Sequence, residues 1–84
     1  MPLSKVDDVL ADRQEQYGDA TDNFERVGRG WGAILDIGDI PPHTVALMMD
    51  FFKTIRCVVN PEHDDSWVDK QGYTQHGHEA ARDA

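Results

Sequence analysis

The segment from about Pro42 to Val59 constrains the fold most, because apolar residues recur along it on two sides of a helical wheel. With about 100° per residue, one apolar sector holds Val45, Met49, Phe52 and Val59, and a nearly opposite sector holds Leu47, Phe51 and Val58. A helix that is apolar on two sides is expected in the middle of a bundle. Its charged residues, Asp50, Lys53 and Arg56, must then pair with other elements or line a site.

Two further helices are predicted before this one. The first runs from about Lys5 to Gln16, and the glycine in Tyr17-Gly18 favours a turn after it. The second starts with a capping pair, Asp22 and Glu25, and carries an apolar stripe made of Phe24, Val27, Trp31, Ile34 and Leu35. Gly28, Gly30 and Gly32 oppose this helix, since each costs about 1 kcal/mol relative to alanine. Either close backbone packing compensates for them or the helix breaks there.

A fourth helix is expected to start near Ser66 and Asp69 and to fray after about His76. Trp67 and Val68 are predicted to point toward the core. No segment has the period of a strand, so the fold class is all-α, a small four-helix bundle-like domain spanning residues 1–84. A chain of 84 residues buries only about 60% of its unfolded surface. We therefore expect a homo-oligomer, a dimer or larger, to complete the core.

Charge and cysteine content narrow the possible partners. Sixteen acidic residues against eight basic ones give a formal net charge of −8, so we expect neither nucleic acid nor a membrane surface as a partner. A nucleotide stays possible where a metal ion reverses the local sign. Cys57 is the only cysteine, and the first residues lack the apolar run of a signal peptide. These features favour a soluble protein of the cytoplasm.

The stretch from His63 to Tyr73 carries the strongest chemical signal. Asp65 and Asp69 lie one helical turn apart, so both carboxylates would project from one side of a helix. Carboxylate pairs of this kind bind hard cations such as Mg²⁺. The same two residues are also typical of helix starts, where acids cap backbone N–H groups and oppose the helix dipole. Both interpretations stay open from spacing alone.

A set of short motifs resembles a small domain of phages and prophages whose function is unassigned. These motifs are Tyr17-Gly18, Asn23-Phe24-Glu25-Arg26, Trp31, the run Val45 to Met49, Lys53 with Arg56, and the segment from His63 to Tyr73. The resemblance covers about Arg13 to Ala80. It places the chain among phage-type proteins, which would act in the cytoplasm of the host cell.

That phage domain is in turn similar to the MazG-like and dimeric dUTPase-like all-α nucleoside triphosphate pyrophosphohydrolases. The resemblance implies that Asp50, Asp65 and Asp69 hold Mg²⁺ and are catalytic. It also implies that Lys53, Arg56, His63 and Tyr73 contact the nucleotide. The match departs from the family pattern at the first acidic pair, where Asp50 stands alone and Lys53 replaces the second acid. This departure leaves the enzymatic activity uncertain.

Other interpretations of the same residues stay open. Lys53 and Arg56 can neutralise Asp50 or other acids instead of binding phosphate, and His63 can cap a backbone group in a loop. Cys57 is expected to be a small buried apolar residue. Arg26 is expected to be exposed to solvent. A non-enzymatic alternative is a phage interaction protein that binds and modulates a host protein through an acidic surface bearing tryptophan.

Overall fold

The structure, a computed structural model, describes residues 6–11 and 19–83, and all regular elements within these two ranges are helices. Residues 6–11 are helical, and they are followed by α2 (Ala20–Leu35), α3 (Pro42–Val59) and α4 (Asp64–Asp83). The predicted all-α fold is therefore confirmed for the described residues. The rest of the predicted first helix and the turn at Tyr17-Gly18 lie outside them.

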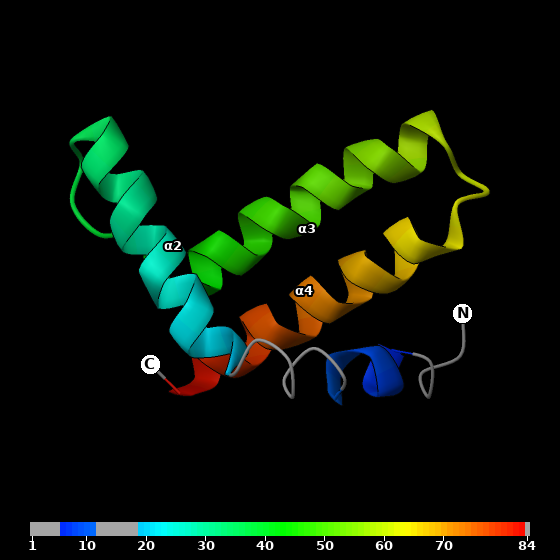
Figure 1. The fold of residues 1–84 in the computed structure, drawn as a ribbon, viewed down its shortest axis with the longest axis horizontal. Coiled ribbons are helices and arrows are strands. Elements are labelled where there is room, and N and C mark those ends of the chain that lie inside the picture. The colour runs from blue at the N-terminus through cyan, green and yellow to red at the C-terminus, as the bar shows by residue number, and fades with distance from the viewer. Residues whose placement is uncertain (1–5, 12–18, 84) are drawn as a thin grey trace.

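Helices α3 and α4 form an antiparallel hairpin and share the most extensive contact between elements (Figure 1). Helix α3 has the bounds that the sequence predicted, because Pro42 suits the first turn and Pro61 follows its end. The N–H of Asn60 donates to the Arg56 carbonyl at 2.9 Å and closes the last turn. Helix α2 crosses the end of the hairpin at which α3 begins and α4 ends.

Most of the residues that α3 and α4 bury are small. The buried positions are Val45, Ala46 and Cys57 on α3, and Ser66, Val68, Gly72, Gly77 and Ala80 on α4. A Cβ added to Gly77 would lie only 3.1 Å from the Cβ of Ala46, so the two backbones approach closely here. This packing accounts for a helix that continues to Asp83, beyond His76, where fraying was expected.

Helix α2 begins two residues earlier than its predicted capping pair. The Asp19 side chain accepts hydrogen bonds from the N–H groups of Thr21 at 2.8 Å and Asp22 at 3.3 Å, so Asp19 is the cap. The glycines do not break the helix. A Cβ on Gly28 would overlap the Ile40 carbonyl oxygen, and one on Gly32 would overlap that of Gly38. Close backbone packing against the linker to α3 thus compensates for the low helix propensity of Gly28 and Gly32.

The outer side of α3 departs from the expectation of a helix in the middle of a bundle. Only the side facing α2 and α4 is buried, and the side that carries Leu47, Phe51 and Val58 is exposed. Phe52 and Val59, which the wheel grouped with buried Val45, are exposed as well. Periodicity identified the apolar sectors but not which of them has a partner within one chain. None of the described helices has the length and apolar character needed to cross a membrane.

The helical residues 6–11 pack against α4. The Val6 side chain is 2% exposed, and a Cβ on Gly72 would come within 3.0 Å of a Leu10 methyl group. Gly72 therefore makes room for Leu10. The first predicted helix thus contributes to the core through its apolar side.

Candidate functional site

Four charged side chains meet between α3 and α4, and we call this group the α3–α4 seam: Asp50, Lys53, Asp69 and Lys70. Lys53 and Asp69 form an ion pair with 3.0 Å between Nζ and Oδ2, and their side chains are 20% and 16% exposed. Lys70 pairs with Asp50, whose side chain is 13% exposed. Each helix supplies one acid and one lysine, so the seam is neutral as a group.

Asp50 is the most constrained member of the seam. Both Lys70 and Thr74 of α4 donate hydrogen bonds to its carboxylate. Burial alone would raise the pKa of Asp50, but the hydrogen bonds from Lys70 and Thr74 and the Lys70 charge outweigh burial and lower this pKa below its ordinary value. Asp50 is therefore a carboxylate at neutral pH. On its own helix, the Thr54 hydroxyl donates to the Asp50 carbonyl at 3.1 Å.

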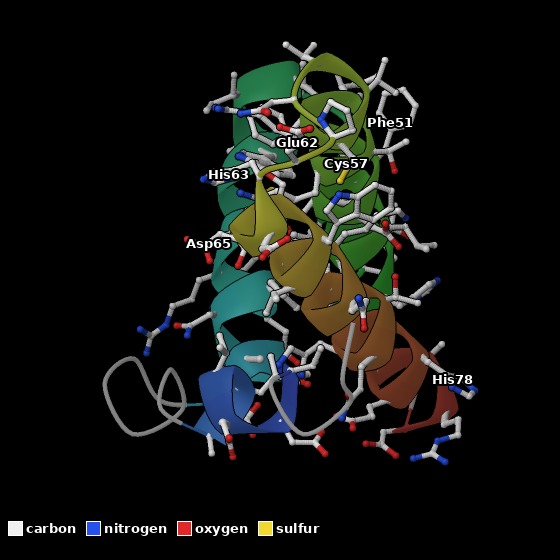
Figure 2. The ribbon with its side chains drawn as sticks, turned by 90° about the vertical axis from the view of Figure 1, so that its right-hand side faces the viewer. Phe51, Cys57, Glu62, His63, Asp65 and His78 are labelled. Carbon is white, nitrogen blue, oxygen red and sulfur yellow. The ribbon has the colours of Figure 1, made fainter. Side chains whose placement is uncertain are left out.

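The other predicted metal ligand, Asp65, lies apart from the seam. Its side chain is exposed in the first turn of α4. Figure 2 shows Asp65 and His63 on the side of the ribbon away from Phe51. Within residues 6–11 and 19–83, no group of three or more His, Cys, Asp or Glu side chains could hold a metal ion. The shared Mg²⁺ site of Asp50, Asp65 and Asp69 stays a prediction.

The predicted nucleotide contacts are dispersed. Arg56 lies over the Phe52 ring, with 5.1 Å from its guanidinium carbon to the ring centroid. His63 Nδ1 is 3.0 Å from the Ser66 hydroxyl, at the turn into α4. The half-buried Tyr73 ring lies 6.1 Å from that of Phe24. Of the predicted substrate-binding residues, only Lys53 lies in the seam.

Sequence reasoning missed Lys70 and Thr74 as partners of Asp50. A signal was present, because the two residues are one turn apart and would project from the same side of α4. A carboxylate on a helix expected to be buried also requires donors from a neighbouring helix. By contrast, Cys57 is buried and Arg26 is exposed, as predicted.

A second feature is the outward face of α3, by which we mean its exposed large apolar residues: Leu47, Met48, Phe51, Phe52, Ile55, Val58 and Val59. Phe51 is 67% exposed and Val59 is 79% exposed. Part of this face is hollowed into a groove of about 530 Å³, lined by Thr44, Leu47, Met48, Phe51, Phe52, Ile55 and Arg56.

A third feature is the acidic turn between α3 and α4, defined by Glu62, Asp64, Asp65 and Trp67, which are all exposed. The Trp67 indole N–H donates to the Pro61 carbonyl at 2.9 Å. Trp67 was expected to point toward the core, and 39% of this residue is exposed. Its neighbour Val68 lies in the core as predicted, with 3% exposed.

Comparison with known proteins places these features in a family. Residues 3–81 match the model of a family described as a domain of unknown function, DUF6378. The chain belongs to this family. It is also similar to the Gene 55 protein of Mycobacterium phage L5, with 36% identity over 72 residues, which are 84% of this chain and 46% of the phage protein. The chain thus spans about half the length of that relative. No solved structure matches it.

These matches confirm the resemblance to a small phage-associated domain of unassigned function. The similarity to MazG-like pyrophosphohydrolases stays a prediction.

Proposed function

We propose that this domain is a non-enzymatic phage interaction protein, which binds a host protein in the host cytoplasm through the acidic turn. The observation that carries the proposal is the contrast between two groups of acids. The carboxylates of Asp50 and Asp69 are held by lysines of the seam, whereas those of Glu62, Asp64 and Asp65 are exposed. Exposed carboxylates at one end of a helical hairpin can steer a basic partner surface toward it.

Trp67 adds an anchor to this charged surface. The hydrogen bond from its indole to Pro61 holds the ring in place, and buried Val68 fixes the helix on which it stands. A ring that is already held loses little conformational freedom on binding. Tryptophan is also enriched among the residues that dominate the energy of protein interfaces. The acidic turn therefore combines steering charges with an aromatic contact.

The test is affinity capture from host lysate with the wild-type domain and two variants. We expect one stoichiometric partner, lost with Trp67→Ala and weakened by added salt or by Asp64→Asn combined with Asp65→Asn. Asp39→Asn is the matched control, since it removes an exposed charge from the linker between α2 and α3. Capture that is insensitive to the turn variants and to salt would contradict the proposal. Circular dichroism checks that each variant is folded.

A second candidate is a MazG-like nucleotide-binding protein, with Mg²⁺-dependent hydrolysis of a (deoxy)nucleoside triphosphate to monophosphate and pyrophosphate. One observation favours it: Asp50 and Asp69 project into one seam from two facing helices. In this proposal Asp50 and Asp69, joined by Asp65, hold Mg²⁺, which would polarise the phosphoryl group and activate a water. Lys53 would leave Asp69 and, with Arg56, neutralise phosphate charge. His63 and Tyr73 would contact the rest of the nucleotide.

Thermal unfolding separates the two candidates. A ligand that binds only the folded chain raises its melting temperature, so Mg²⁺ with a nucleotide should stabilise the domain if the second candidate holds. Asp69→Asn should then abolish both this shift and the release of pyrophosphate. Asp83→Asn, at the far end of α4, is the control. Absence of any shift or pyrophosphate release across the common nucleotides would eliminate the second candidate.

A further inference from the structure

The outward face of α3 is a large apolar surface on a small acidic chain. Its seven residues expose on the order of 700 Å², with about 150 to 200 Å² taken for each fully exposed large side chain. Monomeric proteins rarely leave a contiguous apolar patch of this size open to water. A stable protein interface buries about 800 Å² per partner, so the face alone nearly reaches that size.

We propose that a second copy of this chain covers the outward face of α3, in a two-fold symmetric dimer with α3 packed against α3 of the partner. A two-fold dimer requires a surface that complements itself. The face meets this requirement because it offers both exposed rings and a groove. Phe51 is 67% exposed, and it lines a groove with a volume of about 530 Å³.

The charge distribution favours a copy of the same chain. Sixteen acidic residues give each chain a net charge of −8, so most pairs of surfaces on two copies would repel each other. Helix α3 carries only one of these acids, Asp50, and its carboxylate is held by Lys70 and Thr74 of α4. The outward face therefore brings two copies together without opposing their carboxylates. Arg56, which lines the groove, lies over the Phe52 ring.

The amount of each possible partner in the cell also favours a second copy of this chain over a different protein. An apolar face of this size is an aggregation risk whenever it is uncovered. A second copy is made together with the first in equal amount, so it is present whenever the face needs covering. A small chain with a marginal core also gains the most from burying further apolar area. The acidic turn is made of other residues, so host binding and dimerisation do not require the same side chains.

The test is the molar mass of the purified full chain in solution, by sedimentation equilibrium. We expect the mass of two chains for the wild type and of one chain for Phe51→Asp, a twofold drop, because a carboxylate in a dry interface lacks a partner. Ile34→Asp is the matched control: it makes the same kind of change at a residue of α2 that is 81% exposed and outside the face. This control should keep the mass of two chains.

Val58→Asp gives a second, independent variant on the face, at a residue that is 73% exposed. It should also have the mass of one chain, with its helical circular dichroism retained. A monomeric wild type would overturn the proposal. It would equally be overturned by a dimer that persists in both Phe51→Asp and Val58→Asp, or by one that only Ile34→Asp dissociates.

Discussion

The two sides of α3 are built differently although one helix carries both. Toward α2 and α4 its buried residues are small, and charged Asp50 and Lys53 pair with α4. Away from them it presents seven large apolar residues to solvent. Small residues let backbones approach, and paired charges fix how two helices align. Large apolar residues instead provide apolar surface area that a partner can bury. The inner side thus defines the fold of one chain, and the outward face of α3 offers binding area.

The largest expected effect comes from adding a methyl group on the inner side of α3, where α2 packs against the start of that helix. Gly28→Ala should lower the free energy of unfolding by about 2 to 3 kcal/mol, because the added Cβ meets the Ile40 carbonyl and lies 3.2 Å from a Val45 methyl. Gly30→Ala is the control, since no atom from outside its own stretch of helix backbone lies within 4 Å of its Cβ position. It should raise stability by about 0.5 to 1 kcal/mol through helix propensity. Urea unfolding measures both; similar effects for the two would refute the packing argument.

The contrast between the two sides of α3 can also be tested by truncating one valine on each side. Val45 is 0% exposed and Val58 is 73% exposed. Val45→Ala should therefore cost about 2 kcal/mol of unfolding free energy, because buried methyl groups are lost and a cavity remains. Val58→Ala should change the stability of the monomer by less than about 0.5 kcal/mol. Both are measured in the Phe51→Asp background, so that association does not contribute. Equal losses would mean that α3 has no distinct inner side.

The pH dependence of stability tests the charges on the inner side. The pKa of Asp50 is lowered in the folded chain, so its stabilising contribution is fully present above the unfolded-state pKa of about 3.9. This contribution is lost as the pH falls through the lower, folded-state value. Asp50→Asn should cost about 1 to 2 kcal/mol at neutral pH, and its difference from wild type should shrink below about pH 4. Urea unfolding of the wild type and Asp50→Asn, at neutral pH and below about pH 4, measures this difference in stability.

Asp39→Asn removes an exposed linker charge and serves as the control for that experiment. It should leave the stability at neutral pH within about 0.5 kcal/mol of wild type. A difference between wild type and Asp50→Asn that is constant with pH would argue against a charged Asp50 in the seam.

The smallest expected effect concerns the other ion pair. A double-mutant cycle of Lys53→Met and Asp69→Asn should give a coupling free energy of about 0.5 to 1 kcal/mol, because both side chains retain some contact with water. The same cycle applied to Arg56 and Asp69 is the control. Coupling in the control but not in the Lys53 cycle would mean that a different cation neutralises Asp69.

Much of the fold could be predicted from the sequence. The bounds of α3 followed from its prolines and its apolar period. The charges on a helix expected to be buried indicated that Asp50 and Lys53 must find partners or line a site, but their partners Lys70 and Asp69 were not identified. For the glycines of α2, the sequence left open either close backbone packing or a broken helix, and it did not identify a packing partner. That partner is a backbone carbonyl of the linker, which has no side-chain pattern to detect.

The candidate site was harder to predict. Helical periodicity and residue spacing indicate the direction in which a side chain points, but they do not identify the residue that it contacts. Asp65 and Asp69 lie on one helix as predicted, yet Asp69 faces Lys53 and Asp65 faces solvent. Helix α4 begins at Asp64 rather than at Ser66, and Ser66 is buried beside His63. A shift of this size at a helix start changes which residues cap it. Local sequence signals do not determine such bounds to within a residue or two.

The short turn of the α3–α4 hairpin has a consequence for how the chain folds. Only residues 60–63 separate the two helices that share most of the contacts, so bringing them together costs little loop-closure entropy. Helical proteins with mostly local contacts fold within microseconds to milliseconds. We expect the hairpin to form in the transition state, with α2 docking afterwards. Val68→Ala should therefore slow folding, whereas Gly28→Ala should mainly speed unfolding.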